Sequence, residues 1–142
     1  MMTRIESWPS ALSDYLLRAE RICFRYGSQD CGLFVAGAIR AMTGVDVAST
    51  LRGYKNREEA FKRIAALCGT PTMEAVASHL AGQYGVPEVP VLSAQRGDAV
   101  LLRSGRRSSL GIVAMHGTEI LTPYRAGLLR LPLSHARRAW HI

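Results

Sequence analysis

The sequence has few cysteines, few lysines and no long apolar run. Its three cysteines in 142 residues form no Cys-x-x-Cys pair, which argues against a disulfide scaffold and a zinc ribbon. No apolar run reaches the roughly 18 residues that span a bilayer. The first residues, Met1 to Pro9, contain no apolar stretch of the signal-peptide type. We therefore expect synthesis in the cytoplasm, without a signal peptide or a transmembrane segment.

Arginine carries almost all of the positive charge. Only two of the 18 basic residues are lysines, and 11 acidic residues leave a net charge of +7. The arginines are dispersed, without a basic tail, so nucleic acid is not the expected partner. Arginine suits protein interfaces because its planar group makes several hydrogen bonds. We expect Arg52, Arg106 and Arg107 on exposed loops, at contacts with acidic or polar partners.

Helices are expected in the first 85 residues. Apolar residues at helical spacing predict helices over residues 11–23 and about 30–42. Cap residues that precede apolar periodicity predict two further helices, over residues 56–69 and 72–85. Cys23 and Cys68 then fall late in helices, where buried and inert thiols are expected.

Short strands are expected in the remainder of the chain. They are predicted at about residues 89–92, 99–102, 110–115, 118–121 and 128–131. Residues 134–140 are expected to form a short helical turn, with Trp140 anchored in the core. Helices followed by an antiparallel meander predict one α+β domain over residues 1–142. The expected core includes Leu33, Phe34, Ile39, Phe61, Ile64, Val100, Ile112, Ile120 and Trp140.

Cys31 is the candidate nucleophile. It follows Asp30, a suitable N-cap, and opens a helix in which Arg40 is the only charged residue. The unpaired N–H groups and the dipole at a helix N-terminus favour a thiolate. Cysteine hydrolases build their nucleophile in this way. The alternative interpretation is that Cys31 is a small packing residue at the start of a buried helix.

Four short motifs follow one another along the chain: Phe24–Gly27, Asp30-Cys31, Gly97-Asp98 and Ser109–Ile112. In this order they resemble the NlpC-type cell-wall peptidases, papain-like cysteine endopeptidases of bacteria and phages. The resemblance covers about residues 24–122. It implies a papain-like α+β fold, with N-terminal helices packed on a C-terminal antiparallel sheet, and activity on cell-wall peptides.

A set of small phage and prophage proteins of unassigned function is more similar still. The shared segments are Ala41–Gly44, Arg52–Tyr54, Gly97-Asp98 and Ala139-Trp140. Genes for such proteins tend to lie among tail-tip genes. This resemblance implies a tail-tip or baseplate component, made in the host cytoplasm and incorporated into the virion tail. Its partners would be other tail proteins of the hub, distal tail or tape-measure type.

The peptidase pattern is incomplete at the catalytic base. Thiol hydrolysis needs a base within hydrogen-bond reach of the sulfur, and a third group that orients the base. In ungapped register with the family motif, Ser109 occupies the histidine position, and the third position falls near Leu121 or Thr122. Cys31 therefore lacks its expected base, and Asp30 is expected to act as a helix cap.

The four histidines offer no direct substitute. His116 is expected in a turn, about 20 Å along the strand from the base position, and His79 on a helix surface. His135 and His141 lie in the tail, and a tail histidine that folds back over Cys31 stays open as an alternative. No histidine and cysteine spacing suits a metal site. We expect neither a metal nor another cofactor.

Two functions follow from these observations. The first is a degenerate, inactive peptidase-like module that acts through protein contacts in a phage tail. The second is an active cysteine endopeptidase or amidase on peptidoglycan, with Cys31 as nucleophile and a base from the tail or from a partner chain. The missing histidine favours the first.

Overall fold

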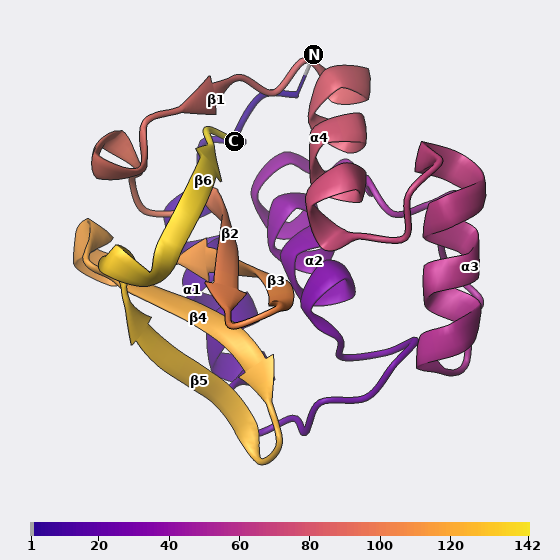
Figure 1. Ribbon diagram of the computed structural model, residues 1–142. Coiled ribbons are helices and arrows are strands. Elements are labelled where there is room, and N and C mark those ends of the chain that lie inside the picture. Colours follow the sequence, from indigo (N-terminus) through magenta and orange to yellow (C-terminus); the bar gives the residue numbers. More distant parts are fainter. Residues whose placement is uncertain (1) are drawn as a thin grey trace.

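The computed structural model describes residues 2–142, and Met1 lies outside them. Within these residues the chain is α+β, with four α-helices that precede a six-stranded antiparallel sheet (Figure 1). The helices are α1 (Trp8–Ala19), α2 (Cys31–Thr43), α3 (Arg57–Cys68) and α4 (Met73–Tyr84). The strands are β1 (Glu88–Val89), β2 (Ala99–Ser104), β3 (Arg107–Val113), β4 (Glu119–Tyr124), β5 (Gly127–Pro132) and β6 (Ala136–Trp140). No helix in the described part is long and apolar enough to cross a membrane.

The expected ends of α2, α3 and α4 are confirmed. Each begins after a residue whose side chain accepts a hydrogen bond from a backbone N–H in the first turn, and each ends at a glycine in the left-handed conformation. The N-caps are Asp30, Asn56 and Thr72, and the terminal glycines are Gly44, Gly69 and Gly85.

Helix α1 begins and ends earlier than the predicted range of residues 11–23. Pro9 is tolerated in its first turn, where its missing N–H costs nothing. After Ala19 the chain leaves the helix to pair with the β4–β5 hairpin, where the Phe24 N–H donates to the Tyr124 carbonyl at 2.9 Å. Cys23 is exposed, so its expected burial is wrong.

The sheet order is β1-β6-β2-β3-β4-β5, so the meander of β2 to β5 is followed by a strand that returns to the other side of the sheet and lies between β1 and β2. The prediction of a helical turn over residues 134–140 is wrong, because residues 136–140 form β6. In this part of the chain, the helical turn is confined to Leu133–His135, which forms a 3-10 turn. Strand β6 pairs with both β1 and β2, opposing Trp140 to Ala99. These backbone hydrogen bonds override a local sequence with little strand character.

The first predicted strand, residues 89–92, is also largely wrong. Strand β1 holds two residues, and Val91–Ser93 forms a 3-10 turn. Pro90 has no N–H to donate to a neighbouring strand, which ends the ladder there. Leu92 is 94% exposed.

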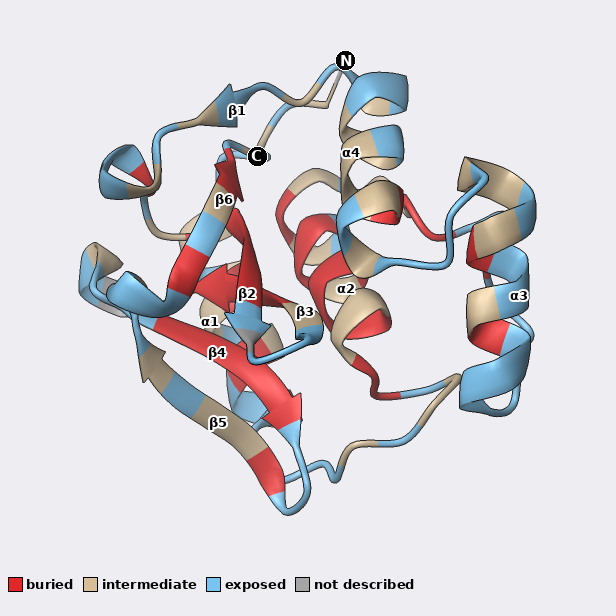
Figure 2. Ribbon diagram, in the orientation of Figure 1, coloured by how far each residue is buried: buried red, intermediate tan, exposed pale blue. Residues whose placement is uncertain are grey.

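The main core lies between α1, α2 and one face of the sheet. Figure 2 shows α2 buried along most of its length, as its lack of charge predicted. Its side chains pack against Leu101, Leu110 and Ile112 of the sheet. A second, smaller core on the other face contains Val100, Leu102, Val113, Ile120, Ala136 and Ala139. Of the nine expected core residues, eight are buried and Phe61 is partly buried.

Asp98 joins both ends of the described chain to the sheet. Its fully buried carboxylate accepts hydrogen bonds from Arg4 at 3.1 Å and from the Gln95 N–H at 2.8 Å, and it lies 2.9 Å from His141 Nδ1. The Ile142 N–H donates to the same carboxylate at 3.3 Å. The Gly97-Asp98 motif therefore fixes a turn and anchors the termini, far along the chain from the Cys31 region.

Candidate functional site

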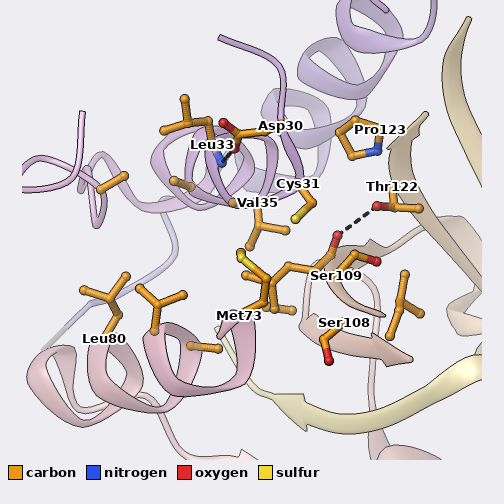
Figure 3. Close-up of a pocket in the computed structure, with 18 of the residues that line it drawn as sticks. Asp30, Cys31, Leu33, Val35, Met73, Leu80, Ser108, Ser109, Thr122 and Pro123 are labelled. Carbon is orange, nitrogen blue, oxygen red and sulfur yellow. Dashed lines mark hydrogen bonds between the residues drawn. The ribbon is translucent and has the colours of Figure 1, made fainter. Parts of the chain in front are cut away.

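Cys31 is the first residue of α2, at the point where this helix meets strands β3 and β4. Figure 3 shows it between Asp30 on one side and Ser109 and Thr122 on the other. Cys31 and Ser109 line one cavity together with Thr122, one of the two residues expected near the third position; Leu121, the other, is not among the lining residues. The fold thus brings together residues from three segments that are distant in the sequence.

Asp30 holds the start of α2 in place. Its Oδ1 accepts from the Leu33 N–H at 2.9 Å, which is the N-cap bond. Its Oδ2 accepts from the Gly27 N–H at 3.0 Å and from the Tyr54 hydroxyl. Asp30 is buried, so these bonds replace the water that its carboxylate loses. A carboxylate saturated in this way is a structural cap.

The backbone conformation explains why the Phe24–Gly27 motif ends in a glycine. Gly27 has φ +87°, and a Cβ at this position would collide with the backbone carbonyl of Tyr54. A glycine is therefore required for the loop before α2 to approach the loop that carries Tyr54.

Tyr54 is a site residue that the sequence analysis did not single out. Its loop is fixed by Arg52, which forms a two-pronged ion pair with Asp46 at 2.9 Å for each bond, and by Arg63, which donates to the Arg52 carbonyl. Burial and the bond to Asp30 raise the pKa of Tyr54, so its phenol stays protonated and donates. The sequence feature that could have pointed to Tyr54 is the Arg52–Tyr54 segment, which is shared with the phage and prophage proteins. Arg52, expected at a partner contact, forms an internal ion pair with Asp46.

The Cys31 thiol is protonated in these surroundings. The residue keeps some exposed surface, but its sulfur lies in the interior. Burial, the largest cause, and the nearby Asp30 carboxylate together raise the pKa of Cys31, which is about 11 when all effects are included. Hydrogen bonding with the Leu110 backbone and the helix terminus lowers the pKa, but by less than burial raises it. At neutral pH the thiolate fraction is therefore very small.

No side chain in the described part of the chain forms a hydrogen bond with the Cys31 thiol. Ser109 and Thr122 have hydroxyl groups, which are too weakly basic to take a proton from a thiol at neutral pH. Thr122 is buried and donates instead to the Leu110 carbonyl at 2.9 Å. The place of the expected base and its orienting group is occupied by two hydroxyls.

The histidines are distributed over the molecule. His116 lies in an exposed turn with φ +73°, and His79 is exposed on α4. His141 contacts Asp98, so this tail residue does not pair with Cys31. His135 lies in the 3-10 turn before β6 and lines the same cavity as Cys31. Within residues 2–142, no group of three or more His, Cys, Asp or Glu side chains could hold a metal ion.

The cavity has a volume of about 970 Å³ and is lined mainly by apolar side chains. This volume lies at the upper end of the range for small-molecule sites. Helices α2, α3 and α4 supply much of the apolar lining, and polar lining residues come from the ends of β2, β3 and β4 and from the loops that hold Asp30, Tyr54 and Arg125. The arrangement offers space for an apolar ligand beside a protonated thiol.

Strands β3 and β4 separate beside Cys31. They pair only at Ile112 with Leu121 and at Val113 with Ile120. Beyond that point the ladder ends, and the Leu110 carbonyl accepts a hydrogen bond from the Thr122 hydroxyl in place of a backbone N–H. Ser109 and Leu110 of β3 and Thr122 and Pro123 of β4 line the cavity at this place.

Sequence comparisons identify one family. No curated protein matches the chain. A family model described as a domain of unknown function, DUF6950, matches residues 3–142. Because the match covers nearly the whole chain, the protein belongs to the DUF6950 family.

Proposed function

We propose that this protein is a non-catalytic, papain-like module of a phage or prophage tail tip or baseplate, which acts through contacts with other tail proteins. The observation that carries the non-catalytic part of the proposal is the Cys31 thiol, whereas the tail assignment rests on the resemblance to small phage and prophage proteins. The thiol stands at a helix N-terminus against the sheet, but burial raises its pKa to about 11, and among the residues that the structure describes no side chain forms a hydrogen bond with it. An activated cysteine nucleophile has a lowered pKa and an adjacent base.

The surroundings of Cys31 support a packing role. Both oxygens of the Asp30 carboxylate already accept hydrogen bonds, Oδ1 from Leu33 and Oδ2 from Gly27 and Tyr54, so the group is engaged in holding the start of α2. Its negative charge also disfavours a thiolate on the adjacent residue. These features stabilise the start of α2 and oppose nucleophilic chemistry there.

Digestion of purified muropeptides tests the absence of activity. We expect no new fragments from the protein after long incubation, as for the Cys31→Ala variant. Cleavage by the natural sequence that is lost in Cys31→Ala would contradict the proposal. A fold check by circular dichroism ensures that both proteins are folded.

Association with tail proteins tests the second half of the proposal. We expect the protein, mixed with hub, distal tail and tape-measure proteins from the same gene neighbourhood, to coelute with at least one of them. Elution as a separate species from all of them would contradict a role in tail assembly.

A cysteine peptidase or amidase is the second candidate, because His135 lines the same cavity as Cys31. In that case His135 would take the thiol proton in a conformation in which the two side chains meet. The muropeptide assay separates the candidates: cleavage that is lost in both His135→Ala and Cys31→Ala, but kept in His79→Ala, would support the peptidase.

A further inference from the structure

The inner side of α4 is incompletely covered. Met73, Val76, Ala77, Leu80 and Ala81 line the cavity, yet among them only Val76 is buried. Figure 2 shows the same feature, with intermediate burial along much of α4 next to the buried α2. Apolar side chains directed at an unfilled space lose contacts that a ligand could supply. The cavity is therefore suited to a large apolar group.

The polar part of the lining is positively charged. Arg103 and Arg107, at the two ends of the β2–β3 turn, and Arg125, in the β4–β5 turn, line the cavity and are exposed. None of the three pairs with a carboxylate in the described part of the chain. Asp30 is the one acidic residue among the described lining residues, and its oxygens are already bonded. The opening therefore favours a negatively charged group.

We propose that this cavity binds an amphiphile with a long hydrocarbon chain and an anionic head group, such as a long-chain fatty acid. The chain lies among the apolar residues of α2, α3 and α4, and the head group contacts Arg103, Arg107 and Arg125. This inference does not depend on the tail proposal, because it rests on the shape and charge of the cavity alone.

An extended peptide is a poorer occupant. Such peptides bind by main-chain hydrogen bonds to a free strand edge. Where β3 and β4 separate, the Leu110 carbonyl already accepts from Thr122, and the Tyr124 carbonyl accepts from the Phe24 N–H, each at 2.9 Å. A hydrocarbon chain has no polar groups, so its burial against the apolar lining leaves no hydrogen bond unmade.

Displacement of the fluorescent fatty acid cis-parinaric acid measures this binding. We expect saturable binding, and displacement by laurate, myristate and palmitate at concentrations below their micelle formation. Each two methylene groups removed should weaken binding about tenfold, as expected for buried hydrocarbon. Hexadecanol, which has no charge, should bind at least tenfold more weakly than palmitate.

Matched variants locate the site. The double variant Arg103→Glu/Arg107→Glu should weaken palmitate binding at least tenfold. The control is Arg18→Glu/Arg21→Glu, which makes the same charge change at two exposed residues at and just after the end of α1 and should leave palmitate binding unchanged. Ala77→Trp and, independently, Ala81→Trp should fill the cavity and abolish binding. Thermal unfolding identifies any variant that fails to fold.

Several results would overturn the inference. They are the absence of saturable binding, equal affinity for palmitate and hexadecanol, no dependence on chain length, or full binding in both tryptophan variants. Displacement of the probe by an apolar peptide but not by palmitate would also refute it. Cosedimentation with phosphatidylglycerol vesicles separates two sources: competition between vesicles and palmitate indicates a membrane lipid, and its absence indicates a free fatty acid.

Discussion

Neutralising the buried carboxylate of Asp98 should destabilise the fold strongly. Asp98→Asn keeps the size of the side chain but removes the charge that faces Arg4, whose side chain is only 16% exposed. The Asp98 carboxylate is fully buried, so the change leaves Arg4 without its partner in a poorly hydrated place. Breaking a buried ion pair from one side costs about 3–5 kcal/mol.

The magnitude should lie near the lower limit of that range, at about 3 kcal/mol, because Arg4 keeps some contact with water and a hydrogen bond to the Ile142 carbonyl at 2.7 Å. For a chain of this length, such a loss lowers the unfolding midpoint by roughly 10 °C. Urea unfolding, followed by circular dichroism, gives the free energy directly.

Glu119→Gln is the matched control. It makes the same chemical change at an ion pair with Arg130, in which both side chains are about half exposed. The expected loss is below about 1 kcal/mol, since exposed ion pairs contribute little. If Asp98→Asn cost no more than Glu119→Gln, the argument that Asp98 anchors the termini would be wrong.

Three further changes test the helix α2 region. Tyr54→Phe removes a hydrogen bond to the buried Asp30 carboxylate and should lower the free energy of unfolding by about 1.5–3 kcal/mol, measured in urea; a loss below about 0.5 kcal/mol would contradict this. Gly37→Ala places a methyl group against the Tyr15 side chain and should cost about 1–3 kcal/mol by overpacking, so an unchanged midpoint would refute the packing. The pKa of folded Cys31 is about 11 against an ordinary value of 9.0, so the unfolded thiol ionises first and stability should fall between about pH 9 and pH 11. Cys31→Ala should lack this component of the fall, and identical pH profiles would contradict the raised pKa.

Local signals predicted the helices well. Asp30, Asn56 and Thr72 cap helices because their side chains accept from the first-turn N–H groups, a requirement that acts within four residues. The glycines in the left-handed conformation that end these helices are also signals that act within one helical turn. The burial of α2 followed from its composition, in which Arg40 is the only charged residue.

Long-range pairing was harder to predict. Strand β6 exists because β1 and β2 offer it backbone partners, and nothing in Ala136–Trp140 itself specifies a strand. Helix α1 ends early because the following segment pairs with β4 and β5, about 100 residues later in the chain. These contacts depend on the topology of the sheet. The periodicity of apolar residues within one segment carries no information about it.

The candidate site was predicted in part. The motifs located Asp30, Cys31 and Ser109 on the correct elements, but the contact between Tyr54 and Asp30 joins two loops with no common pattern. The large cavity was not predicted. The apolar positions of α4 show a helix with one apolar face, and this pattern is the same whether the face meets a neighbouring helix or an open space.

The reactivity of Cys31 tests the central claim most directly. Iodoacetamide labelling at several pH values, with each cysteine followed by peptide mass spectrometry, gives the rate at Cys31 beside those at Cys23 and Cys68. Because the pKa of Cys31 is raised to about 11, we expect very slow labelling at pH 6 to 8, slower than at the exposed Cys23, and a rise only as the pH approaches 11. Rapid and selective labelling of Cys31 at pH 6, ahead of the other two, would reveal an activated thiolate and contradict the non-catalytic account.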